Sequence, residues 1–136
     1  MNTVTFPGRY DSLESISSFV EEAAKEVGLD HKATYAVQLA VDEACCNIID
    51  HAYGGEGLGD IQCSVQVGND TLTIILVDRG QPYSPEKIPQ PKLGLPITKV
   101  KARGVGLFLM RKMMDKVSYE STPESTNILT MVKRRD

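Results

Sequence analysis

The stretch VDEACCNIIDHAY, residues 41–53, places polar side chains inside an apolar helical pattern. Each residue of an α-helix turns by about 100°, so Glu43, Asn47 and Asp50 fall within roughly 60° of one another. Apolar residues spaced by three and four beside them indicate a helix that packs on a core: Ala33, Ala36, Val37, Ala40, Ala44 and Ile48. A carboxylate at the edge of such a core is costly unless it has a partner or a use.

Two interpretations of this helix remain open from the stretch alone. A carboxylate and an amide one turn apart can polarise a hydroxyl group or hold a hard cation through oxygen atoms. A solvated helix face would show the same residues, because amphipathic helices often carry three scattered polar side chains. Motifs elsewhere in the chain are needed to choose between these two interpretations.

Composition and charge limit the classes of protein that fit. The 136 residues are expected to form one domain, residues 1–136, which can bury a core without crosslinks. A net charge of −3 gives no electrostatic case for direct binding to nucleic acid or membrane. No apolar run is long enough for a bilayer and no signal sequence is recognisable, so a cytoplasmic protein is expected. Three cysteines, two of them adjacent, indicate reduced core thiols rather than disulfides or a zinc site.

Periodicity and turn residues predict the order of the elements. Asp11 and Glu14 form a capping-box pattern for a first helix that stops at Gly28, and Asp30 is a suitable N-cap for the second helix. Strands are expected over residues 3–6, 61–67, 71–77, 117–121 and 127–133, and helices after residue 11, over 31–53 and from residue 104. The predicted fold is an α/β (α+β) two-layer sandwich, with three helices covering one face of a mostly antiparallel mixed sheet.

A proline-rich segment interrupts this pattern before the last helix. Five of the seven prolines fall between Pro82 and Pro96, which excludes a regular helix or central strand there. Loops of this length in compact domains usually cover or bind a ligand. We therefore expect a lid over about residues 81–103.

The sequence Asp78-Arg79-Gly80 ends the most hydrophobic strand of the chain. An acid at the end of a buried strand can accept a hydrogen bond from a ligand amine, and the glycine lets the backbone approach a flat ring. A plain turn is the alternative, because Asp and Gly are favoured wherever a strand ends.

A second glycine motif, Arg103-Gly104-Val105-Gly106-Leu107, is predicted to open the last helix. Free N–H groups and the helix dipole favour an anion at such a position, and an arginine adds a bidentate donor. A G-x-G pattern is weak evidence when it stands alone. It follows a proline-rich segment rather than a strand, so a dinucleotide-binding fingerprint is not supported.

Taken in order, these motifs resemble the Bergerat ATP-binding fold of gyrase, heat-shock chaperone, histidine kinase and mismatch-repair ATPases. VDEACCNIIDHAY, DRGQPYSP and RGVGLFLM are most similar to the anti-sigma factor serine/threonine kinases, and the resemblance extends over essentially the whole chain. It implies ATP and Mg²⁺ as cofactors and makes residues 81–103 the ATP lid. Gln81 differs from the proline or glycine that this group often has.

The resemblance also implies roles for individual residues. Asn47 would coordinate Mg²⁺, and Glu43 would be the general base that accepts the proton of a serine or threonine hydroxyl. Asp78 would bind the adenine amino group, with Gly80 leaving room for the ring. The other nucleotide contacts that we expect are Asp50, Arg103, Gly104, Val105, Gly106, Leu107 and, near the adenine on the last strand, Thr130.

The function implied by the resemblance is partner switching. The kinase would phosphorylate a STAS-domain anti-anti-sigma protein, bind or release a sigma factor accordingly, and act as a homodimer. An alternative is a module that uses ATP as a structural switch without catalysis, although the presence of Glu43 favours a kinase. A histidine kinase is not expected, because no dimerising hairpin with a phospho-accepting histidine precedes Thr3.

Four further residues stay open. His51 follows the helical spacing of Glu43 and Asn47, but a structural role is favoured over a metal ligand. Tyr35, Leu39 and Ile49 lie off the main apolar stripe, where packing is favoured over contact with a partner.

Overall fold

The computed structural model describes residues 1–82 and 106–135, and for residues 106–109 it describes the backbone alone. Most of the expected lid, including Arg103, therefore lies outside the described residues. The elements, in chain order, are β1 (Asn2–Pro7), the 3₁₀ turn η1 (Tyr10–Ser12), α1 (Leu13–Val27), α2 (His31–Asn47), the π-helical turn η2 (Ile48–Ala52), β2 (Asp60–Val67), β3 (Thr71–Asp78), α3 (Gly106–Met113), β4 (Lys116–Ser121) and β5 (Asn127–Arg134).

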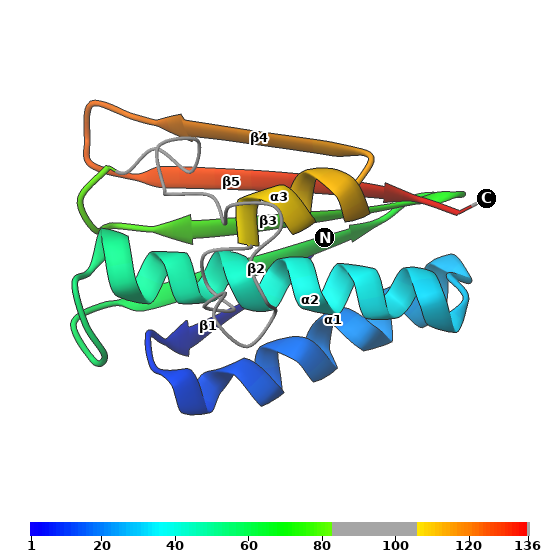
Figure 1. Ribbon diagram of the computed structural model, residues 1–136, viewed down its shortest axis with the longest axis horizontal. Coiled ribbons are helices and arrows are strands. Elements are labelled where there is room, and N and C mark those ends of the chain that lie inside the picture. The colour runs from blue at the N-terminus through cyan, green and yellow to red at the C-terminus, as the bar shows by residue number, and fades with distance from the viewer. Residues whose placement is uncertain (83–105, 136) are drawn as a thin grey trace, which may run out of the picture.

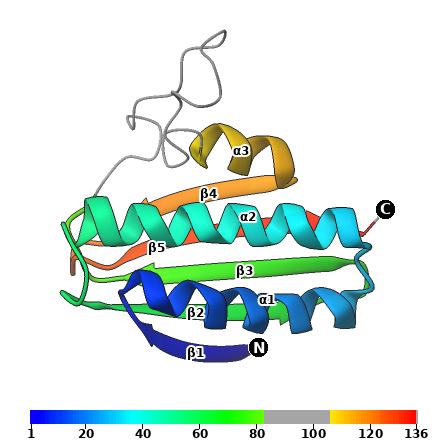
Figure 2. The same cartoon turned by 60° about the horizontal axis from the view of Figure 1, so that its bottom comes forward.

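The five strands form one sheet in the order β1-β2-β3-β5-β4, and each neighbouring pair is antiparallel. The three helices lie together on one face of this sheet (Figures 1 and 2). The predicted two-layer sandwich is thereby confirmed. β5 lies between β3 and β4, so the last strand of the chain is central and β4 forms an edge.

The core lies between the sheet and the helices. Along β3, Leu72, Ile74 and Leu76 are fully buried and alternate with half-buried residues, as a sheet with one covered face requires. The helices contribute the other large buried side chains, which include Ile16, Val20, Val27, Val37, Ile48, Ile49 and Met110. Ile49 is thus a core residue, whereas Tyr35 is 63% exposed.

Two of the three predicted helix-end signals are confirmed. Gly28 adopts the left-handed conformation, with φ of 86°, directly after α1. Asp30 accepts a hydrogen bond from the backbone N–H of Ala33 at 2.7 Å and so caps α2. The predicted capping box of Asp11 and Glu14 is wrong, because η1 runs directly into α1. Asp11 belongs to that turn, and Ser12 at the N-cap already has helical angles.

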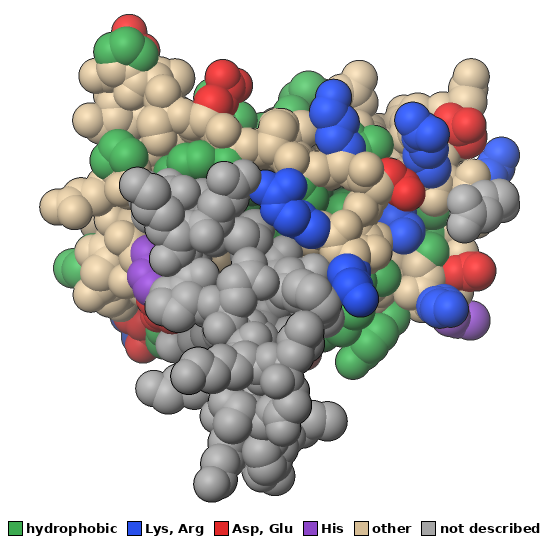
Figure 3. Space-filling view, turned by 45° about the horizontal axis from the view of Figure 1, so that its top comes forward, with side chains coloured by type: hydrophobic (Ala, Val, Ile, Leu, Met, Phe, Trp, Pro, Cys, Tyr) green, Lys and Arg blue, Asp and Glu red, His purple; other side chains and the backbone are tan. Residues whose placement is uncertain are grey.

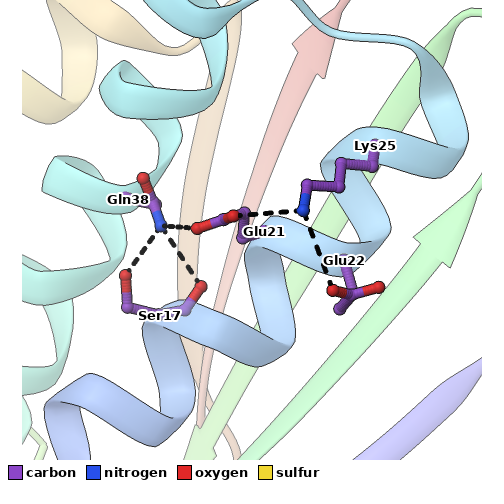
Figure 4. A network of polar contacts seen from close by, with 5 residues as sticks. All are labelled: Ser17, Glu21, Glu22, Lys25 and Gln38. Atoms are coloured by element: carbon purple, nitrogen blue, oxygen red, sulfur yellow. Dashed lines mark hydrogen bonds and ion pairs between the residues drawn. The ribbon is translucent and has the colours of Figure 1, made fainter.

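A polar network joins α1 to α2 at the surface of the helical layer (Figure 4). The side-chain amide of Gln38 on α2 donates to the hydroxyl of Ser17 at 3.0 Å and to the carboxylate of Glu21 at 3.1 Å. Lys25 lies 3.4 Å from the other oxygen of Glu21. These contacts fix the register between the two helices where their apolar stripe meets solvent.

The cysteines are free thiols and all three are buried, in agreement with the expected core position. Burial raises the pKa of the Cys63 thiol to about 12 and the pKa of Cys45 well above its ordinary value. These thiols are therefore protonated and unreactive in the folded state. As for the membrane, none of the described helices is long and apolar enough to cross a bilayer.

Candidate functional site

The last turn of α2 carries two polar side chains next to the core. Asn47 is the final residue of the helix and is only 2% exposed, which is unusual for an amide side chain. Glu43 lies one turn earlier on the same face, and its Oε2 atom is buried. The structure therefore places a carboxylate and an amide together at the edge of the core.

The chain continues from Asn47 into the π-helical turn η2 rather than ending α2 cleanly. A π turn holds more residues than an α turn, so Asp50 does not keep the α-helical phase that relates it to Glu43 and Asn47. Its carboxylate instead accepts a hydrogen bond from the hydroxyl of Tyr10 in η1. His51 in the same turn is exposed, and the described part of the chain contains no group of three or more His, Cys, Asp or Glu residues that could hold a metal.

Asp78, at the end of β3, is an acid almost completely removed from solvent. Its side chain is 2% exposed, and one oxygen, Oδ1, accepts hydrogen bonds from the backbone N–H of Gly80 at 2.9 Å and from the side-chain amide of Asn127 at 2.7 Å. Burial raises the pKa of Asp78, and the two hydrogen bonds act in the opposite direction. A buried carboxylate held in this way is preorganised to accept a further hydrogen bond from a ligand.

Asn127, the first residue of β5, was not singled out in the sequence. It is 1% exposed and faces Asp78 directly across the two strands. Its amide nitrogen donates to Asp78 Oδ1 and to the carbonyl oxygens of Gly80 at 3.1 Å and Gln81 at 3.3 Å. Its own oxygen accepts from the Ser121 hydroxyl at 2.7 Å, which fixes the orientation of the amide. The sequence offered one signal for this residue, namely a polar side chain at the start of an apolar strand.

Gly80 follows β3, and its backbone packs against the end of the α2–η2 helix. A Cβ atom at this position would lie 2.4 Å from the carbonyl oxygen of Ala52, so no side chain fits. The next residue, Gln81, donates its backbone N–H to the same oxygen at 2.8 Å. The glycine is therefore required for close approach of two backbones, and this contact brings the Asp78 and Asn47 ends of their elements together.

Thr130 is not brought to this site. In β5 the buried residues Asn127, Leu129 and Met131 face the helices, and Thr130 lies on the opposite face. It pairs with Ile75 and Ser118, three residues along the strand from Asn127 and about 10 Å away by the rise of a strand. The structure therefore does not place Thr130 next to Asp78, and Asn127 occupies the position beside that acid.

The expected phosphate-binding segment is described only in part. α3 begins at Gly106 and packs against α2 (Figure 2). Arg103, Gly104 and Val105 lie outside the described residues, as does the side chain of Leu107. The predicted helix start at Gly104 therefore lies outside the described residues. The N-terminal N–H groups of α3 supply the positive end of the helix dipole.

This donor set fits a nucleotide with its metal ion. Mg²⁺ in phosphoryl-transfer sites is usually held by one or two side-chain oxygens together with phosphates and waters, and Asn47 offers such an oxygen while Glu43 supplies a carboxylate one turn away. Asp78 Oδ1 is already engaged within the protein, and a neighbouring base with an amino group suits the second oxygen of the carboxylate.

Comparisons with known proteins identify the family of this chain. Residues 6–133 match the histidine kinase-like ATPase domain family. The serine-protein kinase RsbW of Halalkalibacterium halodurans is 33% identical over 135 residues, covering 96% of this chain and 80% of that protein. RsbW of Bacillus velezensis is 31% identical over 113 residues, covering 79% of this chain and 69% of that protein.

Solved structures share the fold at low sequence identity. The RsbU and RsbW domains of a Mycobacterium tuberculosis protein superpose with a TM-score of 0.63 at 14% identity, over 98% of this chain and 32% of that chain. The catalytic domain of the histidine kinase ThkA gives a TM-score of 0.55 at 15% identity, over 99% of both chains. The chain therefore belongs to the histidine kinase-like ATPase domain family and, within it, to the group of the serine-protein kinases RsbW.

Proposed function

We propose that this chain uses Mg-ATP to phosphorylate a serine or threonine hydroxyl of a STAS-domain anti-anti-sigma protein in the cytoplasm. In the same proposal, a homodimer of the chain binds a sigma factor and releases it when the partners switch. The observation that carries the proposal is the buried Asp78 carboxylate, held by Gly80 and Asn127 beside the end of α2 that bears Asn47 and Glu43. Family membership supports the use of ATP.

Binding of the nucleotide is assigned to three groups of residues, which contact the adenine, the metal ion and the phosphates. Asp78 accepts a hydrogen bond from the adenine amino group. Gly80, two residues later, has no side chain, so its backbone can lie close to that of Ala52. Asn47 holds Mg²⁺, which when bound neutralises phosphate charge. The phosphates are assigned to the start of α3 and the segment before it: Arg103, Gly104, Val105, Gly106 and Leu107.

Glu43 is assigned as the general base. A carboxylate at the core edge is less solvated than an exposed one and is held in place by its helix. It accepts the proton of the attacking hydroxyl while the nucleotide is positioned one helical turn away. Asp50, tied to Tyr10, supports the η2 turn and is not assigned a direct contact.

Asn127 is assigned as a positioning residue for Asp78. Its amide holds one carboxylate oxygen and the carbonyls of Gly80 and Gln81, so it fixes both the acid and the start of the expected lid. The hydrogen bond also favours the ionised carboxylate, because it lowers a pKa that burial raises.

A pH profile tests this assignment. In the wild type, ATP affinity is expected to fall on acidification with a midpoint above 3.8, the ordinary pKa of an aspartate, because protonation turns the other oxygen of Asp78 into a hydroxyl donor that faces the adenine amino group. Asn127→Ala removes the contact that lowers the pKa, so the midpoint should move to higher pH. Ser64→Ala, a matched change at a buried polar residue of β2, should leave it unchanged. Identical profiles for wild type and Asn127→Ala would contradict the assignment.

Phosphoryl transfer to a purified STAS-domain protein tests the function as a whole. With γ-labelled ATP and Mg²⁺, label is expected on a serine or threonine of the acceptor. ATP binding without transfer to any STAS-domain acceptor would instead favour the alternative of a non-catalytic, ATP-dependent regulatory module.

A further inference from the structure

A groove of about 590 Å³ lies at the end of α2 opposite to Asn47. It is bounded by the first turns of α2, the end of α3 and the end of β5, which come from three separate parts of the sequence. Ala33 lines the groove, and fourteen residues of helix at about 1.5 Å each place it about 20 Å from Asn47. The groove is therefore separate from the nucleotide site.

The groove is basic although the chain is acidic overall. Five cationic residues line it, namely Lys32, Lys112, Lys133, Arg134 and Arg135, and Asp30 is the single acid among the described lining residues. Asp30 is already engaged in capping α2. Figure 3 shows Lys and Arg side chains gathered on the side of the molecule where α3 ends, with a few acidic side chains between them. In a chain of net charge −3, this concentration of positive charge is local.

Helix capping explains part of this charge. Lys133 donates to the carbonyl of Met113 at 2.6 Å, and Arg135 donates to the carbonyl of Val27 at 3.1 Å, so each lies at the C-terminal end of a helix. Capping does not account for Lys32 and Arg134, which line the same groove from different elements. The capping contacts also hold two cations in fixed positions, and each retains further N–H donors.

The floor and rim of the groove are apolar. Leu29, Ala33, Ala36 and Met113 contribute half-buried surface between the basic side chains. Tyr35 lines the groove as well and is 63% exposed, although a tyrosine ring normally buries most of its surface. A ligand for this groove would combine negative charge with at least one apolar side chain.

We propose that the groove docks an acidic protein segment that carries an apolar residue against Tyr35. Asp115 lies beside the groove, but its carboxylate accepts from the backbone N–H of Arg134 at 2.6 Å. A nucleic acid is disfavoured by the net negative charge of the chain. The acidic segment belongs to a partner protein, and its binding does not depend on the nucleotide assignments.

The experiment uses fluorescence anisotropy with a labelled 14-residue peptide of Glu and Ser that carries two Leu four residues apart. The double variant Lys32→Glu/Arg134→Glu is expected to weaken binding by about tenfold or more, since it reverses two groove charges. The control Arg9→Glu/Lys116→Glu makes the same charge change at exposed positions outside the groove and should bind like the wild type. Tyr35→Ala should weaken binding without changing its salt dependence.

Three outcomes would overturn the proposal. Equal effects of the two double variants would mean that net charge, not the groove, governs binding. Equally tight binding of a labelled (dT)14 oligonucleotide would favour a nucleic-acid surface instead. A change in oligomeric state of the wild type that Lys32→Glu/Arg134→Glu abolishes, without peptide binding, would make the groove a contact between copies. ATP affinity measured on all variants is expected to be unchanged, which separates failure here from failure of the proposed function.

Discussion

Glu43→Gln is expected to lower phosphoryl transfer by about 10² or more while Mg-ATP binding persists. The amide is nearly isosteric with the carboxylate, so the position at the edge of the core stays filled. It cannot accept the hydroxyl proton, because its nitrogen is a donor and its oxygen is a poor base. The loss should therefore appear in the rate of transfer and not in the affinity for nucleotide.

Asp42→Asn is the matched control for this variant. Asp42 precedes Glu43 on α2 and is half-buried, so its change removes a neighbouring negative charge from the same helix. Transfer should stay within a few-fold of the wild type, since Asp42 is not assigned to the site. Equal loss in both variants would point to helix charge rather than a base, and unchanged transfer in Glu43→Gln would remove Glu43 from the role.

Asp78→Asn is expected to abolish most of the discrimination between ATP and GTP. Asn can keep the contacts that Oδ1 receives from Gly80 and Asn127, but it then presents an amide nitrogen where the second carboxylate oxygen stood. Two donors would face each other at the adenine amino group, and an unpaired buried donor costs about 1–3 kcal/mol, or about fivefold to 150-fold in affinity. The guanine carbonyl would accept from the new amide.

The stability of this variant shows whether the loss is local. Burial raises the pKa of Asp78, so folding disfavours its ionised carboxylate relative to the unfolded chain. Removing the charge should leave the midpoint of urea unfolding unchanged or move it upward. Full discrimination for ATP in a folded variant would contradict the adenine assignment, whereas lower stability would show that Asp78 mainly holds the fold.

Much of the fold could be predicted from the sequence because local rules decide it. Gly28 ends α1, Asp30 caps α2, and the alternation along β3 marks the buried face. The capping box failed because η1 continues into α1, and nothing in the pattern of Asp11 and Glu14 distinguishes a 3₁₀ turn from an N-cap.

The site was harder to predict because it depends on strand register. Asp78 was found as an acid at the end of an apolar strand, but its partner Asn127 lies 49 residues later and meets it only through the β3–β5 pairing. The face on which Thr130 lies could not be predicted, because almost every residue from 128 to 132 is apolar and alternation cannot assign a face in such a run. The π turn that redirects Asp50 has no sequence signature of its own.

Calorimetric titration with ATP, with and without Mg²⁺, on the wild type and Asn47→Ala shows whether this site binds Mg-ATP through Asn47. We expect Mg²⁺ to strengthen ATP binding in the wild type, and Asn47→Ala to lose this gain while keeping metal-free binding. Equal weakening with and without Mg²⁺ would show that Asn47 is not a metal ligand. Absence of binding to the wild type at millimolar ATP would contradict the nucleotide site altogether.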